Sequence, residues 1–282
     1  MKRVLLVAAI GLAALPLLAQ APAPAVVPPA LVAPAASTPA VETQGHGSKV
    51  WIGRHAEFEE FLRTAHVDHV DKIPVGVTKP ERGFFAPGGL AGSAAVKHLP
   101  MGQRAGFWEA YKSEIAAYQL DRLLGLDMVP PTVERRVGSD LASVQLWVEG
   151  CRVIKDVDQK ACPKPVEWAK QVLRQKVFDN LTANIDRNQG NLLVDGEWNL
   201  ILIDHSRAFG SDKMPFMKEM TRVDRAFFER LKALDEASVM KQVRPWVLGD
   251  GTARAILKRR DKIVAQLEQL ARERGEAVVF PF

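Results

Sequence analysis

Three polar side chains in two neighbouring segments could carry chemistry on a phosphate. Asp186 and Asn191 are five positions apart in the polar segment NIDRNQGN, and Asp204 ends the apolar run LILID. One carboxylate can orient an attacking hydroxyl, while an amide and a second carboxylate can hold the magnesium that neutralises the phosphates of ATP. These residue types in this order are the ones that phosphoryl transfer from ATP requires.

The elements around these residues make the pattern more specific than the residues alone. An Asp followed five positions later by an Asn is common by chance. Here the pair is followed by an apolar strand, a turn at Gly196, a second apolar strand and then Asp204. A hairpin holds two side chains at a defined separation better than loops do. The alternative is an Asx-rich turn that caps a helix, next to an Asp that merely ends a strand.

Upstream residues offer a charged pair that this chemistry also uses. Lys97 lies in the apolar context AAVKHL, where an unpaired ammonium would be costly to bury. Glu114 lies on the following helical segment, in YKSEIAAY. A lysine on a strand and a glutamate on the next helix can pair and present the ammonium to ATP phosphates. The alternatives are a strand-edge charge for Lys97 and a surface position for Glu114.

Hydrophobic periodicity predicts a strand-rich first part with one long helix, followed by a helical part with one small hairpin. The predicted helices are residues 53–69, 104–124 and 165–183 and three more within 221–275; the predicted strands are three within 73–99, then 131–137, 142–148, 191–195 and 199–204. Gly125 follows the second helix and is expected to end it.

The segments NIDRNQGNLL and LIDHSRAFG resemble the catalytic segments of atypical kinases. These kinases include the secretory-pathway group called family with sequence similarity 20, the HipA-type bacterial kinases and the phosphoinositide 3/4-kinase-like superfamily. The resemblance spans roughly residues 73–210 and is nearest to the secretory group, which carries an Asn-x-Asp-Arg loop. It implies an α+β, bilobal protein-kinase-like fold, with a small antiparallel-sheet N-lobe that carries one long helix and a mainly helical C-lobe.

The resemblance implies a role for each candidate residue. Asp186 would be the catalytic base, and Asn191 and Asp204 would be ligands of Mg2+ or Mn2+. Lys97 would bind the phosphates of ATP while paired with Glu114.

The same resemblance places the rest of the nucleotide. The stretch that contains Gln145, Trp147 and Glu149 would be the hinge that holds adenine through backbone groups, and Gly76 would lie in the loop that covers the phosphates. This loop lacks the Gly-x-Gly-x-x-Gly pattern of ordinary protein kinases, and no Ala-Pro-Glu segment follows the metal-binding Asp. The usual peptide-docking platform is therefore not expected.

The first 21 residues have the pattern of a signal peptide. Lys2 and Arg3 precede an apolar run that ends at Leu18, and small residues favour cleavage near Ala21. The run is shorter than the roughly 20 residues of a spanning helix, and an uncleaved anchor is the alternative. The sequence thus predicts a secreted or periplasmic protein with no membrane span after cleavage.

Composition predicts the domain organisation. Residues 22–50 form an Ala/Pro-rich linker that cannot close a core. Residues 51–150 form the N-lobe with the ATP-binding sheet and helix, and residues 151–282 form the C-lobe with the catalytic loop, the metal site and the C-terminal helices. Loss of Lys2 and Arg3 with the signal peptide lowers the net charge from +5 to +3, which is too small to indicate nucleic acid as a partner.

The sequence contains two cysteines, Cys151 and Cys162. In an exported protein, two cysteines this close most simply form a disulfide, which would contribute about 2–3 kcal/mol. A zinc site is not expected, because no second Cys or His pair lies nearby.

These observations favour an exported ATP- and metal-dependent kinase-like phosphotransferase that acts on a hydroxyl of an unknown protein, glycan or lipid. The alternative is a catalytically silent pseudokinase or nucleotide-binding scaffold, since the bacterial periplasm holds little ATP. A third reading is a metal-dependent hydrolase that uses Asp186, Asp204 and His205, although it explains neither Lys97 nor Glu114.

Overall fold

The computed structural model describes residues 47–73 and 80–282, which belong to one unit of the chain. The predicted signal peptide, most of the linker and Gly76 lie outside the described residues. Folded structure begins slightly before the predicted boundary, because Lys49 is buried and the Ser48 amide donates to Asp195 at 2.8 Å. Within the described ranges, no helix is long and apolar enough to cross a membrane.

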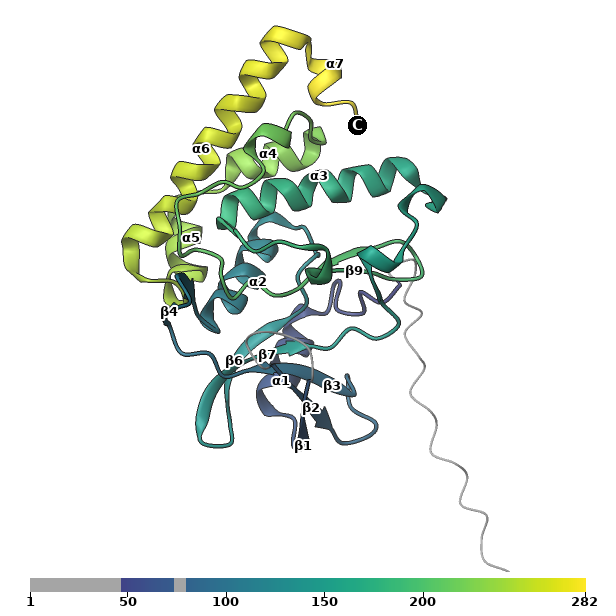
Figure 1. Cartoon of the computed structure of the whole chain (residues 1–282), viewed down its shortest axis with the longest axis vertical. Helices are drawn as coiled ribbons and strands as arrows, with labels where there is room; N and C mark the ends of the chain where they lie inside the picture. The colour runs from purple at the N-terminus through teal and green to yellow at the C-terminus, as the bar shows by residue number, and fades with distance from the viewer. Residues whose placement is uncertain (1–46, 74–79) are drawn as a thin grey trace, which may run out of the picture. The chain divides into compact units, whose positions relative to one another are not determined.

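A five-stranded antiparallel sheet, in the order β1-β2-β3-β7-β6, forms the first part of the fold (Figure 1). Its strands are β1 (Val67–Lys72), β2 (Glu81–Phe85), β3 (Ser93–Lys97), β6 (Thr132–Val137) and β7 (Asp140–Leu146). Val96 and Val144 on one face pack with Phe58 and Leu62 of helix α1 (His55–Thr64). Because side chains alternate along a strand, Lys97 lies on the opposite face of the sheet.

The start of the described chain differs from the prediction. A single helix was expected over residues 53–69, but α1 ends at Thr64 and the chain enters β1 at Val67. Ala65 already has extended backbone angles, and β1 pairs with β2 over residues 67–72. Sheet pairing, which the local helical period does not reveal, therefore decides the conformation of residues 67–69.

A second difference lies between β3 and the long helix. The predicted helix over residues 104–124 begins only at Lys112, as α2 (Lys112–Leu124), and a hairpin of β4 (Gly102–Arg104) and β5 (Phe107–Glu109) precedes it. Ala105 and Gly106 both have positive φ, at 47° and 82°, as a tight two-residue hairpin turn requires. Gly125 ends α2 in the left-handed conformation, as predicted.

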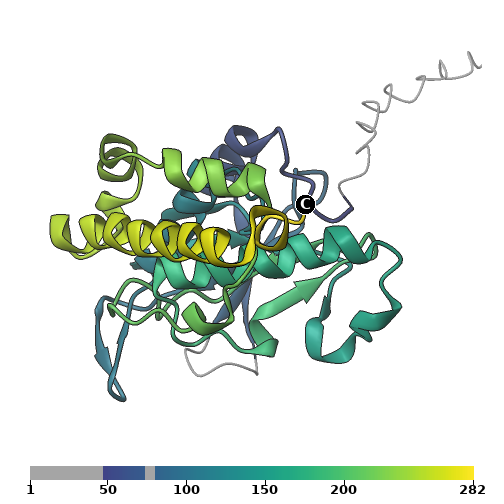
Figure 2. The ribbon, with the colours of Figure 1, turned by 90° about the horizontal axis from the view of Figure 1, so that it is seen from above.

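The second part of the fold is mainly helical. Its elements are β8 (Arg152–Val153), α3 (Pro165–Thr182), β9 (Leu192–Val194), β10 (Leu200–Leu202), α4 (Arg225–Ala233), α5 (Glu236–Gln242), α6 (Gly249–Arg274) and α7 (Glu276–Val279). Helix α6 packs against α3, α4 and α5, and Figure 2 shows it running along this layer. Phe178, Leu181, Ile256 and Ile263 belong to the core between these helices. The predicted fold class, a small antiparallel sheet with a long helix followed by a mainly helical part, is confirmed.

The structure does not show the predicted disulfide. Cys151 and Cys162 are both free thiols. Cys162 is buried in the apolar core of the helical part, whereas Cys151 packs against the separate core of the sheet. Burial, the largest influence, raises the pKa of the Cys151 thiol to about 11. Cys162 is buried and Cys151 is only partly buried, and the two pack against different clusters, which spacing along the chain does not reveal.

Candidate active site

Three elements bring Lys97, Glu114 and Asp204 together. Lys97 ends β3, Glu114 lies in the first turn of α2, and Asp204 follows β10. Lys97 Nζ lies 2.5 Å from Glu114 Oε1 and 2.8 Å from Asp204 Oδ1. The charged pair expected from the sequence is therefore present, and Asp204 extends it to a group of three.

Burial opposes the charged form of all three groups, but their mutual attraction is stronger. The side chains of Glu114 and Lys97 are 2% and 11% exposed. After the opposing effect of burial, the neighbouring carboxylates raise the pKa of Lys97, and Lys97 lowers the pKa values of Glu114 and Asp204. The ammonium and both carboxylates are thus ionised at neutral pH.

Asp204 has a left-handed backbone conformation. Its φ of 57° lies in the left-handed region, which costs a non-glycine residue roughly 1 kcal/mol. Asp204 Oδ1 accepts from Lys97 and, at 3.0 Å, from the Ser206 hydroxyl. Among the described residues no group donates to Asp204 Oδ2, so one carboxylate oxygen remains for another ligand.

The β9–β10 hairpin places Asn191 next to Asp204. Leu192 pairs with Leu202, and the Ile203 amide donates to the Asn191 carbonyl at 3.2 Å. Asn191 and Asp204 therefore flank the same end of the hairpin. The Asn191 amide nitrogen donates to the Asp186 carbonyl at 3.4 Å, so the amide oxygen is left for another partner.

Arg187, whose role the sequence did not indicate, holds this part of the site together. Its guanidinium is 2% exposed and contacts both carboxylate oxygens of Asp179 at 3.0–3.1 Å. It also donates to the carbonyls of Asn191 and Ile203 at 2.8 and 2.7 Å and to His205 Nε2 at 2.7 Å. One side chain thereby connects α3, the polar loop and the segment between β10 and Asp204.

The Arg187 contact also defines the state of His205. A guanidinium only donates, so Nε2 of His205 accepts and the neutral ring carries its proton on Nδ1. Nδ1 faces Glu114 Oε2 at 3.7 Å. Burial, followed by the charge of Arg187, lowers the pKa of His205, which keeps the ring neutral. His205 is thus a buried neutral side chain that lies between Arg187 and Glu114.

Arg207 is a second site residue without a predicted role. Its Nη1 lies 3.2 Å from Asp186 Oδ2, and its Nε donates to Glu109 Oε1 at 2.8 Å. Its guanidinium also covers the ring of Phe107, 4.2 Å from the centroid. Its sole sequence signal is its place in LIDHSRAFG, because Glu109 and Phe107 come from the hairpin, a segment that the sequence predicts as helix.

Comparison with solved structures identifies proteins that share this fold. The chain superposes on the Golgi casein kinase with Mn/ADP bound, with a TM-score of 0.61 and 15% identity over 80% of this chain and 78% of that one. It superposes on hydra Fam20 with sugar, with a TM-score of 0.60 and 14% identity over 80% of this chain and 91% of that one. The chain has the fold of the Fam20 kinases. The predicted resemblance is confirmed at the level of the fold.

Sequence comparison finds a relative that is named as a kinase. Over 138 residues the chain is 36% identical to phosphatidylinositol 4-kinase gamma 4 of Oryza sativa subsp. japonica, a match that covers 42% of this chain. The match covers 23% of that relative, so the chain spans about a quarter of its length. No family model matches the sequence.

The three predicted hinge residues lie in different environments in this Fam20-type fold. Gln145 lies within β7, and its amide donates to the Thr132 hydroxyl at 2.8 Å. The Trp147 amide donates to the Ser93 carbonyl at 3.2 Å. Glu149 is exposed, and its Oε1 lies 2.5 Å from Arg82.

The sheet register nevertheless relates this segment to Lys97. Arg82, Ala95 and Gln145 are direct neighbours across β2, β3 and β7, and Lys97 is two positions from Ala95. These four side chains therefore share one face of the sheet. The Arg82 guanidinium lies over the ring of Trp147, with its Cζ atom 4.2 Å from the ring centroid.

The donor set at the end of the β9–β10 hairpin suits a hard divalent cation. A carboxylate oxygen of Asp204 and the amide oxygen of Asn191 are ligands that Mg2+ and Mn2+ favour. In the part of the chain that the structure describes, no cluster of three or more His, Cys, Asp or Glu could hold a metal alone. Two protein oxygens fit an ion that takes its other ligands from phosphates and water.

Proposed function

We propose that the chain is an exported, ATP- and metal-dependent phosphotransferase that acts on a hydroxyl of a protein, a glycan or a lipid. The observation that carries the proposal is the ion-paired group of Lys97, Glu114 and Asp204, assembled from three elements of a Fam20-type fold. A buried ion pair contributes little net stability, and apolar residues in its place are often as stable. Its presence beside a polar loop is better explained by binding of a charged ligand.

Each residue then has a role in the transfer. Lys97 binds the phosphates of ATP, with Glu114 holding its ammonium in place. Asp204 and Asn191 hold Mg2+ or Mn2+, which neutralises phosphate charge when bound. Asp186, 39% exposed in the adjacent loop, orients the acceptor hydroxyl and takes up its proton. A Mn/ADP complex of a protein with the same fold supports this choice of ligands.

Adenine is proposed to bind beside the face of the sheet that carries Lys97. Gln145, Trp147 and Glu149 belong to the segment that leaves β7 at this face. Since the backbone of Gln145 is paired within the sheet, the groups open to adenine belong to the residues after β7. Gly76, in the proposed phosphate-covering loop, is outside the described residues.

Nucleotide binding provides the first test. The chain from residue 22 onward is mixed with ATP and either Mg2+ or Mn2+, and its thermal unfolding is followed. At a nucleotide concentration of about 100 Kd, binding adds roughly 2.7 kcal/mol of stability. We expect this shift in the wild type and in Asp186→Ala, and none in Asp204→Ala. No shift with either metal would contradict the proposal.

Turnover separates an enzyme from a silent scaffold. Wild-type protein should release ADP or phosphorylate itself, whereas Asp186→Ala should bind nucleotide with transfer strongly reduced. Binding without turnover in the wild type would instead support a nucleotide-binding scaffold. Phosphoester cleavage without nucleotide would indicate a hydrolase.

Export is the remaining part of the proposal, and the N-terminal sequence supports it. Expression with the complete N-terminus should give a mature protein that begins near residue 22 outside the cytoplasm. N-terminal sequencing of the fractionated protein tests this, and an intact Met1 on a membrane-bound product would favour the uncleaved anchor.

A further inference from the structure

The carboxylate of Asp186 has one charged partner in the described part of the chain. Arg207 Nη1 lies 3.2 Å from Asp186 Oδ2. The other contacts of Asp186 involve its backbone: its carbonyl accepts from the amide groups of Asn188 and Asn191, at 3.1 and 3.4 Å. These contacts hold the loop but leave the side chain free to rotate. The orientation of the carboxylate therefore depends on Arg207.

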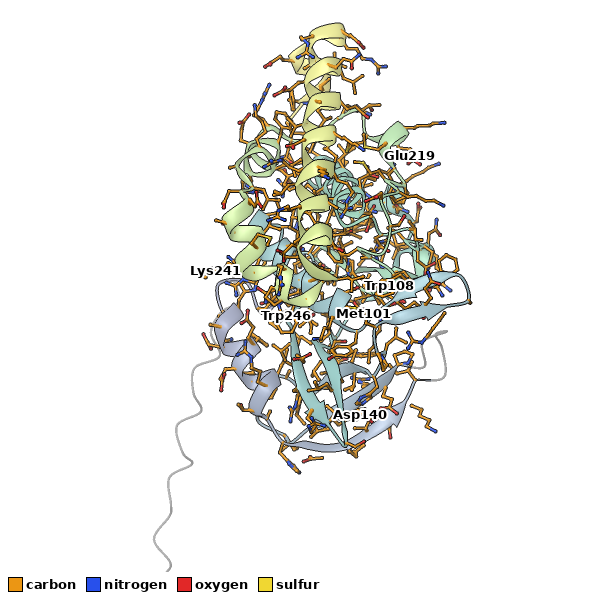
Figure 3. The ribbon with its side chains drawn as sticks, turned by 90° about the vertical axis from the view of Figure 1, so that its left-hand side faces the viewer. Met101, Trp108, Asp140, Glu219, Lys241 and Trp246 are labelled. Carbon is orange, nitrogen blue, oxygen red and sulfur yellow. The ribbon has the colours of Figure 1, made fainter. Side chains whose placement is uncertain are left out.

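Arg207 is itself held by the β4–β5 hairpin. Its Nε donates to Glu109 Oε1 at 2.8 Å, and its guanidinium lies over the Phe107 ring. Glu109 is 4% exposed and Arg207 is 14% exposed, so this contact is shielded from solvent. The backbone strengthens it, because the Ala110 amide donates to the Ser206 carbonyl at 3.0 Å. Figure 3 shows this hairpin, with Trp108 labelled, projecting from the rest of the fold.

We propose that Arg207 is a positioning residue for the transfer reaction and that the β4–β5 hairpin determines its place. It holds Asp186 through Oδ2 and leaves Oδ1 to accept the hydrogen bond of the acceptor hydroxyl. This inference rests on the proposed function, in which Asp186 contacts the acceptor. It assigns a role to the hairpin, which belongs to neither the sheet nor the helical core.

Geometry and charge explain why this contact matters for the rate. A guanidinium fixes a carboxylate by a charge-assisted hydrogen bond that is stronger than a neutral one. A misplacement of about 1 Å in a reacting group can lower the rate roughly 100-fold. ATP binding, by contrast, involves Lys97 and Asp204 and should not depend on Arg207. The residue should thus affect kcat and not the KM for ATP.

The variants must allow for the buried Glu109. Arg207→Ala alone leaves that carboxylate without its cation, which can prevent folding. The double variant Glu109→Gln/Arg207→Ala removes both charges together. Arg207→Lys retains the positive charge but lacks the planar guanidinium that can contact two partners at once. Arg225→Ala is the matched control, because Arg225 also pairs with a glutamate, Glu276, and covers a phenylalanine ring but lies in α4.

The experiment measures ADP release from ATP with Mg2+ or Mn2+, with water or the chain itself as acceptor. We expect the double variant to lower kcat about 10–100-fold with the KM for ATP changed less than about twofold. Arg207→Lys should recover part of the loss, and Arg225→Ala should match the wild type. Adding Asp186→Asn to the double variant should cost nothing beyond Asp186→Asn alone, since both changes act through one carboxylate.

Three results would overturn the inference: a folded double variant with wild-type kcat, a loss that adds to that of Asp186→Asn, or a rise in the KM for ATP. A wild-type protein that transfers no phosphoryl group would instead refute the proposed function. The two failures are therefore distinguishable.

Discussion

Lys97 Nζ lies 2.8 Å from Asp204 Oδ1, although 107 positions separate the two residues in the sequence. Glu114 contacts the same ammonium from α2 and also accepts the His205 amide at 2.9 Å. The sheet, the long helix and the β9–β10 hairpin therefore meet at the Lys97 ammonium. A substitution of Lys97 should therefore affect both the stability of the fold and nucleotide binding.

Removal of the Lys97 ammonium should destabilise the fold. Lys97→Met leaves Glu114 buried without a counter-charge, which typically costs about 3–5 kcal/mol. Lys97→Met/Glu114→Gln should recover most of this loss, because no uncompensated buried charge remains. Urea unfolding at neutral pH measures both values. Equal destabilisation in the two variants would show that the charge balance is not the cause.

Arg187 should not tolerate replacement by lysine. A lysine ammonium cannot reach Asp179, two carbonyls and His205 together, so Arg187→Lys leaves buried acceptors unsatisfied at a cost of about 2–4 kcal/mol. Arg254→Lys is the control, because Arg254 makes a single exposed pair with Glu236. The control should keep the wild-type urea midpoint. A wild-type midpoint in Arg187→Lys would show that the network adds no stability.

Gly210 should be required for the close packing of the β4–β5 hairpin against the segment after Asp204. A Cβ atom on Gly210 would lie 2.5 Å from Trp108 Cβ and 2.8 Å from its Cδ1. Gly210→Ala should therefore cost about 1–3 kcal/mol, as overpacking does. Gly251→Ala, where an added Cβ meets no atom within 4 Å beyond its chain neighbours and its own helix backbone, should be neutral or slightly stabilising. Thermal unfolding compares the two, and equal midpoints would contradict the close packing at Gly210.

Asp224 should make stability depend on acid pH. Its carboxylate binds Arg174 at 2.7 and 2.8 Å and caps α4 through the Phe227 amide. Burial alone would raise the pKa of Asp224, but the hydrogen bonds and charge of Arg174 lower it. Below about pH 3.9, the ordinary value for Asp, the unfolded chain binds the proton more readily than the folded protein. The stabilisation is thus present above that pH and lost as the pH falls further.

Asp224→Asn provides the measurement for this pH dependence. The asparagine can still cap α4 but has no charge for Arg174. The difference in unfolding free energy between wild type and variant should be largest near pH 7 and shrink below pH 4. A difference that stays constant from pH 7 to pH 3 would contradict the assigned cause.

Both cysteines should titrate as thiols without prior reduction. In denaturant at pH 8, a thiol reagent should detect two groups per chain, and reductant should leave the thermal midpoint unchanged. Under native conditions both should react slowly, because Cys162 is buried and the pKa of Cys151 is raised to about 11. A midpoint that falls on reduction would show that the protein does form the bridge.

Local patterns in the sequence determined much of this protein. The helices α2, α3 and α6 and the β9–β10 hairpin follow from apolar spacing, and Gly125 ends α2 as its lack of a side chain allows. The polar loop with Asp186 and Asn191, and Asp204 after the second strand, follow from the order of short segments. Each of these features depends on residues a few positions apart, so the sequence alone could indicate them.

Tertiary structure decided what depends on residues far apart. The β4–β5 hairpin has an apolar pattern that also fits a helix, and its pairing together with the turn at Ala105 and Gly106 settles the choice. Arg207 reaches Glu109, 98 positions earlier, only because that hairpin exists. The free cysteines likewise reflect two separate cores. In each case the free energy comes from burial and pairing between distant segments, which local spacing cannot encode.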